Sequence, residues 1–391
     1  MATQVSGLLT DPRVREAYPV LKDVVYLNVG TYGIMPTPAL EAFQAIQGEF
    51  EQRGIASNHT CGRKTEETRQ RLAALLGVTP EEIAFTRNAT DGINLTLAGI
   101  DWQPGDEVII TDEEHEAINH PTMYLHNTKG VVVRRVSVSP DAAVMRSRLE
   151  AAWSPRTRLA ALSFVSCESG TRLPGQAIAD WAREKGVLSL LDGAQVTGAM
   201  KVDLREIGCD FYTSNGHKWM SAPKGTGFFY GKRESLLKLS PAHVGAGSLE
   251  TYDLATETAV PFSTGQRFEF GTRAWGLTAG WSASLDWFES LGWDNVYGHV
   301  AALADHFKER IQERPGLRLL TPVKAEESAG LTSFVIEGHE AQKVSQAMRE
   351  QHNIFLRVIP HYNAIRVSTA HFNNEEDIDK LMRGLEAYRT Q

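Results

Sequence analysis

Short apolar, strand-like runs alternate with amphipathic helical stretches between residues 63 and 231, and this alternation restricts the folds open to the chain. It predicts a mostly parallel sheet covered by helices on both faces. In such sheets, ligands bind outside the carboxyl ends of the strands. The expected strands are 82–86, 107–111, 131–137, 158–165, 187–192 and 226–231, and the expected helices are 63–76, 91–98, 142–153 and 176–186.

The order of the elements changes after about residue 275. Two long helical patterns, at 276–291 and 296–314, come before strands at 331–337 and 364–368 and a last helix at 374–389. At 391 residues the chain is long enough for two domains. We therefore expect an α/β protein with a large domain at 19–275 and a smaller α+β domain at 276–391. The amino-terminal segment 1–18 is expected to join the smaller domain.

Composition excludes several classes of protein. The formal net charge of −8 argues against a protein devoted to nucleic acid or to an anionic membrane, because both need a basic face. No apolar run approaches the roughly 20 residues that cross a bilayer, and residues 1–18 lack the apolar core of a signal peptide. Three cysteines without a CxxC pair, and histidines without ligand spacing, predict neither disulfides nor a metal site. A cytoplasmic protein is expected.

An acid and a lysine end two neighbouring strands of the predicted sheet. The apolar run 187–192 stops at Asp192, and a second strand runs from Asp210 to Ser214 just before Lys218. Pyridoxal phosphate chemistry needs a lysine to hold the aldehyde and an acid to keep the pyridine nitrogen protonated. The alternative is a structural salt bridge between Asp192 and Lys218.

Two further strand ends favour the cofactor site. Residues 85–92 close a strand and open a helix, so that backbone N–H groups and the Thr90 hydroxyl can hold a phosphate. A plain helix cap by Thr90 or Asp91 is the alternative. Residues 111–115 end in His115, whose ring can stack on a flat heterocycle or serve a structural role. Four such strand ends in one crevice predict a pyridoxal phosphate site.

Several motifs resemble the class V aminotransferase group of fold-type I pyridoxal phosphate enzymes. This group includes cysteine desulfurases, selenocysteine lyases, isopenicillin N epimerases and cystine C-S lyases. The resemblance extends from about residue 24 to the end of the chain and is greatest to the cystine C-S lyases, through YLNVGTYGIMPTPALEA and LAGIDWQPGDEVIITDEEH. The other motifs are TRNATDGINL, LLDGAQVTGAMKVDL, DFYTSNGHKW, RFEFGTRAW and IRVSTAHFNNEEDID.

The resemblance implies a role for each matching residue. Lys218 would hold the cofactor aldehyde, Asp192 would pair with the pyridine nitrogen, and His115 would stack on the ring. Gln195 would bind the phenolic oxygen. Thr272 would reach the phosphate of a neighbouring subunit, which implies a homodimer with shared active sites. The residues implied to hold the phosphate within one subunit are Ala89, Thr90, Ser214 and His217.

Two arginines near the end of the chain match substrate-binding positions of the family. Arg366 matches the arginine that binds the substrate α-carboxylate, a task that suits the planar guanidinium fork. Arg357 matches a second arginine of the cystine lyases, where a longer substrate presents a distal carboxylate. A solvated surface arginine is the alternative for Arg357.

The sequence departs from the family pattern in two places. Cysteine desulfurases carry a cysteine nucleophile in the small-domain loop before the carboxylate-binding arginine, but residues 339–366 contain no cysteine. Cys167 stands where desulfurases have an asparagine beside the cofactor. Cys167 is either a reactive thiol or a small buried hydrophobic residue.

The resemblance therefore predicts a pyridoxal-phosphate-dependent lyase. The expected reaction is β-elimination on cystine, cysteine or a related sulfur amino acid, which gives pyruvate, ammonia and a sulfur product. Epimerization and transamination begin with the same removal of the α-proton, so both stay open. A non-catalytic protein of the same fold is disfavoured by the presence of Lys218, Asp192 and Arg366 together.

Overall fold

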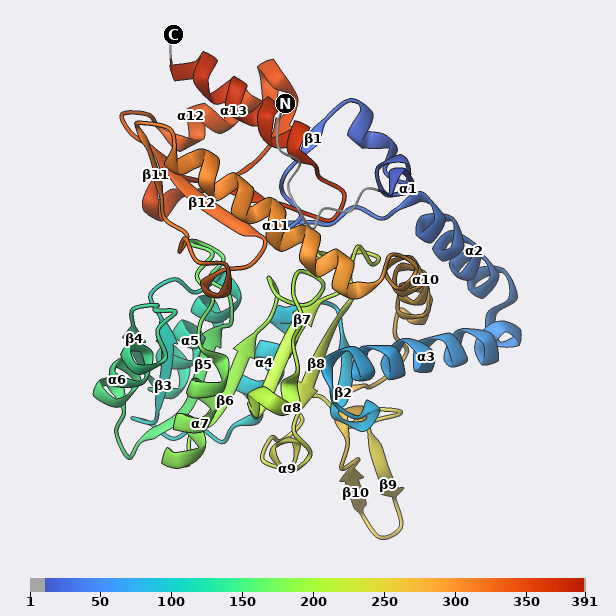
Figure 1. Cartoon of the computed structure of the whole chain (residues 1–391). Helices are drawn as coiled ribbons and strands as arrows, with labels where there is room; N and C mark the ends of the chain where they lie inside the picture. The colour runs from blue at the N-terminus through green and yellow to red at the C-terminus, as the bar shows by residue number, and fades with distance from the viewer. Residues whose placement is uncertain (1–10, 390–391) are drawn as a thin grey trace.

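The chain folds into two lobes, which lie one above the other in the computed structural model (Figure 1). The model describes residues 11–389, so the first ten residues of the predicted segment 1–18 lie outside the described residues. The lower lobe surrounds a seven-stranded sheet, and the upper lobe surrounds a four-stranded sheet. The predicted α/β architecture is confirmed.

The large sheet has the strand order β2-β8-β7-β6-β5-β3-β4. The strands from β7 to β4 are parallel, whereas β8 is antiparallel to both β7 and β2. All seven strands were expected from their apolar runs, although β5 ends two residues early. Their bounds are β2 Ile83–Thr86, β3 Glu107–Thr111, β4 Val132–Val136, β5 Thr157–Ser163, β6 Leu188–Asp192, β7 Phe211–Asn215 and β8 Gly227–Gly231.

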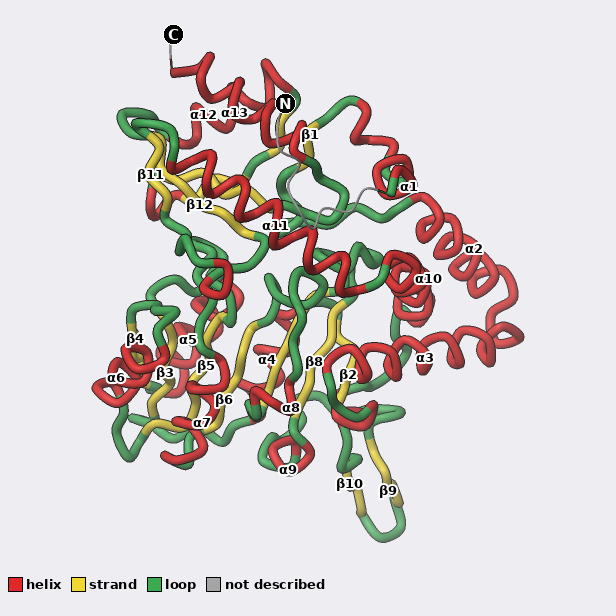
Figure 2. Tube along the Cα trace, in the orientation of Figure 1, coloured by secondary structure: helices red, strands yellow, loops and turns green. Residues whose placement is uncertain are grey.

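Helices cover both faces of this sheet, as the tube in Figure 2 shows. Successive strand residues enter different hydrophobic clusters: Leu191 and Phe228 lie in one, and Leu190 and Phe229 in the other. This alternation follows from the two-residue period of a strand. The helices of the lower lobe are α2 Thr37–Arg53, α3 Asn58–Leu76, α4 Ala89–Gly99, α5 Glu116–Lys129, α6 Ala142–Ala152, α7 Gly175–Lys185, α8 Leu204–Ile207, α9 Arg233–Leu236 and α10 Trp275–Leu291.

Local sequence fixes where the helices nearest the site begin. The Asn88 side chain accepts a hydrogen bond from the Asp91 N–H and caps α4, so the alternative of a plain cap by Thr90 or Asp91 does not hold. His115 caps α5 in the same way, through the Ala117 N–H. Both caps place the start of a helix directly after a strand of the large sheet.

The upper lobe holds an antiparallel sheet of order β11-β12-β15-β14, packed against three helices. The amino-terminal part of the chain contacts this lobe: β1 pairs in parallel with β13, and Arg15 forms an ion pair with Asp377. The bounds are α1 Pro12–Glu16, β1 Val25–Tyr26, α11 Trp293–Gln312, β11 Leu317–Leu319, β12 Leu331–Ile336, α12 Ala341–His352, β13 Ile354–Phe355, β14 Arg357–Ile359, β15 Ala364–Ser368 and α13 Glu375–Arg389.

Helix α10 packs against α2 and α3, and the ring centroid of Trp281 lies 6.4 Å from that of Phe228 in the large sheet. Helix α11 continues from α10 into the upper lobe (Figure 1). The predicted domain boundary at residue 275 remains a prediction.

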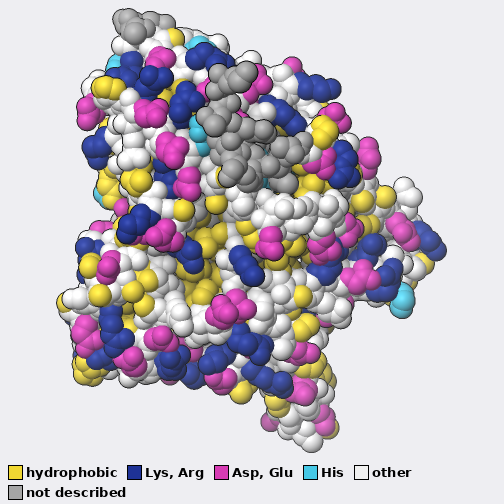
Figure 3. Space-filling model, viewed as in Figure 1, with side chains coloured by type: hydrophobic (Ala, Val, Ile, Leu, Met, Phe, Trp, Pro, Cys, Tyr) yellow, Lys and Arg dark blue, Asp and Glu magenta, His cyan; other side chains and the backbone are white. Residues whose placement is uncertain are grey.

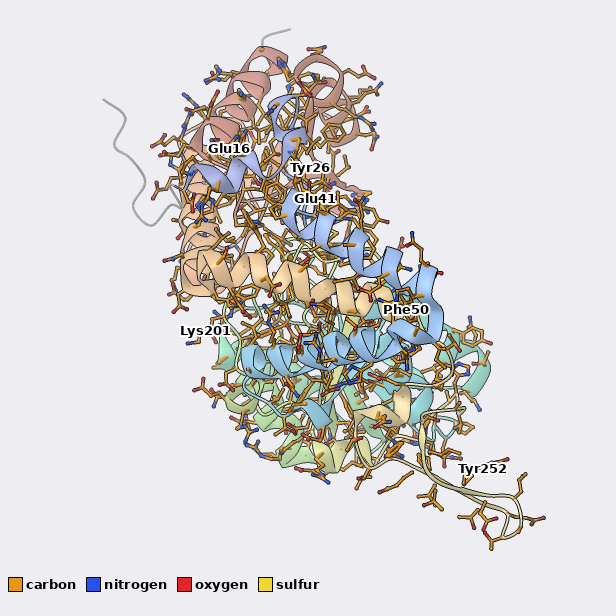
Figure 4. The ribbon with its side chains drawn as sticks, turned by 90° about the vertical axis from the view of Figure 1, so that its right-hand side faces the viewer. Glu16, Tyr26, Glu41, Phe50, Lys201 and Tyr252 are labelled. Carbon is orange, nitrogen blue, oxygen red and sulfur yellow. The ribbon has the colours of Figure 1, made fainter. Side chains whose placement is uncertain are left out.

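A two-stranded hairpin, β9 Leu249–Asp253 with β10 Thr258–Pro261, projects from the lower lobe. Figure 4 shows Tyr252 on this hairpin, far from the labelled Glu16 and Tyr26 beside the upper lobe. The 3-10 helices are η1 Pro19–Lys22, η2 Gly54–Ser57, η3 Pro80–Glu82, η4 Gly265–Phe268, η5 Ala325–Glu327 and η6 Pro360–Tyr362.

The face in Figure 3 intermingles basic and acidic side chains instead of gathering one sign of charge. Within residues 11–389, no helix is long and apolar enough to cross a membrane.

Candidate active site

A cavity of about 710 Å³ is lined by residues from both lobes and by the ends of several strands of the large sheet. Its volume is within the range of small-molecule sites in proteins. Ser214 and Thr272 do not line it. Nine of the predicted site residues do: Ala89, Thr90, His115, Asp192, Gln195, His217, Lys218, Arg357 and Arg366.

Lys218 follows β7 and is half-buried in the cavity wall. Burial lowers the pKa of its ammonium group to about 8, although the nearby Asp192 carboxylate opposes this shift. Asp192 and Lys218 form no ion pair in the described part of the chain. The alternative of a structural salt bridge between them is therefore excluded. A lysine with this pKa is partly neutral near pH 8 and can act as a nucleophile or a base.

Asp192 and Gln195 follow β6 and are fixed by short hydrogen bonds. The Asp192 Oδ1 accepts from the Ala194 N–H at 2.9 Å, and burial raises the pKa of this carboxyl group. The Gln195 Nε2 donates to the Gly30 oxygen at 3.0 Å, and its Oε1 accepts from the Trp219 indole N–H at 3.0 Å. One amide hydrogen of Gln195 is left for a ligand.

His115 presents a neutral ring in the cavity. Its Nδ1 accepts from the Ala117 N–H at 3.0 Å, which fixes the ring at the start of α5. Burial and the charge of Lys218 lower the imidazole pKa to about 4. A neutral, oriented imidazole suits stacking on an aromatic ring.

The proposed phosphate cradle differs in detail from the expectation. The Ala89 N–H donates to the Asn215 Oδ1 at 2.9 Å, and the Ser214 hydroxyl donates to the Gly193 oxygen at 2.8 Å. Thr90 and His217 line the cavity, so the start of α4 still offers an anion site there. Thr272 is exposed outside the cavity of its own chain, and its contact with a neighbouring subunit remains a prediction.

Arg366, on β15, is a buried cation with a free donor. Its guanidinium donates to the Cys167 oxygen at 2.7 Å and to the Thr31 hydroxyl at 3.3 Å, but its buried Nε has no partner within residues 11–389. A buried donor without a partner is costly. A carboxylate ligand would satisfy it, since arginine binds carboxylates through parallel hydrogen bonds. Arg357 is exposed on the neighbouring strand β14.

The backbone at Gly33 passes so close to the backbone of Lys218 that only glycine fits there. The Gly33 N–H donates to the His217 oxygen at 2.8 Å, and a Cβ at Gly33 would lie 2.0 Å from the Lys218 oxygen. Any larger residue would displace the chain that carries Lys218. The segment that ends in Gly33 also contributes Gly30, the acceptor for Gln195.

Three supporting residues were not recognised from the sequence. Trp219 orients Gln195 through its indole N–H. Asn215 binds the start of α4. Glu114 joins β3 to β5 by accepting hydrogen bonds from Thr111 and Ser163, and burial raises its pKa to about 7. The sequence offers one signal for Glu114, which is its position next to His115.

These residues fit pyridoxal phosphate. The cavity combines a half-buried lysine, a buried carboxylate at a strand end, a neutral imidazole and a helix start. The unpartnered Nε of Arg366 adds a place for the carboxylate of an amino acid. Within the described residues, no group of three His, Cys, Asp or Glu could hold a metal ion.

Comparison with known proteins supports the assignment of the cavity as a pyridoxal phosphate site. The family model described as aminotransferase class-V matches residues 36–381. The chain belongs to the class V aminotransferase family. It is 30% identical to a cysteine desulfurase of Cronobacter sakazakii over 403 aligned residues, which cover 95% of this chain and 97% of that protein.

Among class V structures, it is similar to the cystine C-S lyase C-DES in complex with its reaction product cysteine persulfide. The TM-score is 0.86 at 31% identity, over 94% of this chain and 98% of that one. A C-DES variant with glycine covalently linked to its PLP cofactor gives a TM-score of 0.87, also at 31% identity, over 95% of this chain and 98% of that one. The predicted family and fold type I are confirmed, and the chain is a cysteine desulfurase-like or C-S lyase-like protein of class V.

Proposed function

We propose that this protein is a pyridoxal-phosphate-dependent C-S lyase, which carries out β-elimination on cystine, cysteine or a related sulfur amino acid. The observation that carries the proposal is one cavity that holds a half-buried lysine of lowered pKa and a buried arginine with an unpartnered Nε. Such a site can bind an amino acid by its carboxylate and remove its α-proton.

When bound, pyridoxal phosphate withdraws electrons from the substrate Cα, which stabilises the negative charge left by the proton. Lys218 holds the cofactor aldehyde and then carries the α-proton on its Nζ. Asp192 keeps a proton on the pyridine nitrogen, and His115 orients the ring by stacking. Arg366 binds the α-carboxylate, and Arg357 binds the distal carboxylate of cystine. The β-sulfur departs as a thiol or, from cystine, as a persulfide, and hydrolysis of the remaining aminoacrylate by one water molecule gives pyruvate and ammonia.

The cysteines of the chain favour a lyase over a desulfurase that forms a persulfide on its own thiol. Cys61, Cys167 and Cys209 are all buried, and residues 339–366 contain no cysteine. Burial raises the pKa of the Cys167 thiol to about 11, so its nucleophilic thiolate is scarce at neutral pH. A sulfur product released into solution is consistent with this arrangement.

The proposal includes a homodimer in which Thr272 of one subunit reaches the phosphate site of the other. Thr272 is exposed beside Arg273, whose guanidinium holds the segment by donating to the Phe268 oxygen at 3.4 Å. Sedimentation equilibrium would measure the subunit number. A fully active monomer would exclude shared active sites.

The direct test is incubation of the protein, loaded with pyridoxal phosphate, with L-cystine. We expect pyruvate, ammonia and sulfane sulfur in equal amounts, and no turnover or lysine-bound absorption band in Lys218→Ala. Formation of a D-amino acid or a keto acid from sulfur-free amino acids, without pyruvate from cystine, would instead assign the protein to the epimerases or aminotransferases. Arg357→Ala, with the distal contact removed, should impair cystine more than cysteine.

A further inference from the structure

The hairpin formed by β14 and β15 brings a small-lobe edge strand to the cavity. Strand β14 is the last strand of its sheet and pairs with β15 alone in that sheet. Four successive residues, 357–360, line the cavity. An edge strand has hydrogen-bonding partners on one side only, so its position depends strongly on what holds its ends.

The register of this hairpin places two cations opposite each other. Arg357 of β14 is the direct partner of Arg366 of β15, and both line the cavity. Like charges at directly opposed positions repel. Arg366 is held by Cys167 and Thr31, whereas no ion pair or side-chain hydrogen bond holds Arg357 in the described structure. The repulsion therefore acts to displace the edge strand.

The tip of the hairpin is anchored to the large lobe by Tyr362. The Tyr362 hydroxyl donates to the Glu113 Oε1 at 2.8 Å. Glu113 is itself buried, and its Oε2 accepts from the hydroxyls of Ser166 and Ser169. This buried side chain, fixed by two serine hydroxyls, is a firm anchor for the tip of the hairpin.

Two neighbouring residues support the anchor. The His361 Nδ1 lies 3.0 Å from the Glu168 Oε2, and the His361 ring stacks on Tyr362 with centroids 4.6 Å apart. The His361 contact is largely exposed and hence weak. On the other side, Asn363 accepts from the Ala341 N–H at 2.8 Å, which ties the tip to its own lobe.

We propose that Glu113, acting through Tyr362, is a positioning residue for Arg357 and thereby sets the preference for substrates with a distal carboxylate. This inference rests on the proposed function, in which Arg357 binds that carboxylate. The Glu113–Tyr362 hydrogen bond holds β14 against the charge of Arg366. Without it, the β14 backbone that carries Arg357 is held less firmly, whereas Arg366 keeps its hydrogen bonds to Cys167 and Thr31.

Binding of unreactive amino acids to the loaded enzyme tests this proposal without turnover. L,L-2,7-diaminosuberate is cystine with both sulfurs replaced by methylene groups and keeps the distal carboxylate, whereas L-2-aminooctanoate lacks the distal carboxylate and the distal amino group. Titration of the visible absorption would give both dissociation constants. We expect Tyr362→Phe to raise the constant for diaminosuberate at least fivefold and that for aminooctanoate less than twofold. Equal changes for the two ligands, or none for diaminosuberate, would overturn the proposal.

A double-variant cycle shows whether Tyr362 acts through Arg357. In an Arg357→Gln background, Tyr362→Phe should change the diaminosuberate constant less than twofold, and a full fivefold loss there would contradict the proposal. If Arg357→Gln alone affects both ligands equally, the distal-carboxylate role fails and the inference fails with it. Tyr252→Phe, which removes an exposed hydroxyl from the hairpin of β9 and β10 on the lower lobe, is the control and should change neither constant. Absence of pyruvate from cystine would reject the lyase reaction separately.

Discussion

The guanidinium of Arg366 donates a 2.7 Å hydrogen bond to the main-chain oxygen of Cys167, and so links the small sheet to the large one at the cavity. This bond leaves the Nε free to bind a ligand. A lysine cannot make this contact and also bind a carboxylate through two parallel bonds. We expect Arg366→Lys to lower kcat/KM for cystine by about 10- to 100-fold, the effect of losing one charged hydrogen bond. Most of the loss should be in KM, and an unchanged KM would exclude Arg366 as the carboxylate ligand.

The same contact predicts that the Cys167 thiol is dispensable. Arg366 binds the main-chain oxygen of Cys167, which any residue supplies, and burial keeps the thiol protonated by raising its pKa to about 11. Cys167→Ala should therefore retain kcat/KM for cystine within about threefold, because the thiolate needed for nucleophilic attack is scarce. Steady-state kinetics with persulfide labelling check this. A persulfide on Cys167 during turnover, lost together with activity in the variant, would identify the thiol as a sulfur carrier.

Uptake of pyridoxal phosphate by the cofactor-free protein should depend on the protonation of Lys218. The amine must lose its proton before it attacks the aldehyde, and its pKa in the folded protein is about 8. The rate of appearance of the absorption band should therefore rise with pH and level off above about pH 8. Because the Asp192 carboxylate raises the Lys218 pKa, Asp192→Asn should move the midpoint to lower pH. Stopped-flow mixing across pH 6 to 10 would measure both, and a shift to higher pH would contradict the assigned interaction.

The strands of the large sheet could be predicted because most of them contain a short apolar run, which in several ends at a polar residue. Asp192 illustrates this, as a carboxylate at the end of the run LSLLD. Helix α5 was not predicted, since His115 caps it and Pro121 lies within it, which obscures the helical pattern. The hairpin of β9 and β10 was also missed because most of its side chains are exposed and show no apolar alternation.

The residues that line the cavity followed from motifs, but the residues that support them did not. Tyr362 and Glu113 lie 249 positions apart, and only the packing of the two lobes brings them together. Ala89 was expected to offer its N–H to the phosphate, yet Asn215 takes that N–H because β7 ends beside the start of α4. Such pairings depend on how strands end relative to one another, and spacing along a sequence does not specify that.

The indole of Trp219 should affect the cofactor through Gln195. Its N–H holds the Gln195 Oε1, which turns the Nε2 toward Gly30 and the cavity. Trp219→Phe removes this donor and leaves a buried acceptor unsatisfied, at a cost of about 1–3 kcal/mol in the free energy of unfolding. Because the amide is then free to rotate, we expect the visible absorption maximum of the bound cofactor to shift and kcat to fall about 10-fold. Trp102→Phe is the matched control, since the Trp102 N–H bonds to the Leu97 oxygen away from the cavity. It should lower the melting temperature without changing the spectrum. Equal spectra for both variants would show that Trp219 is needed for packing alone.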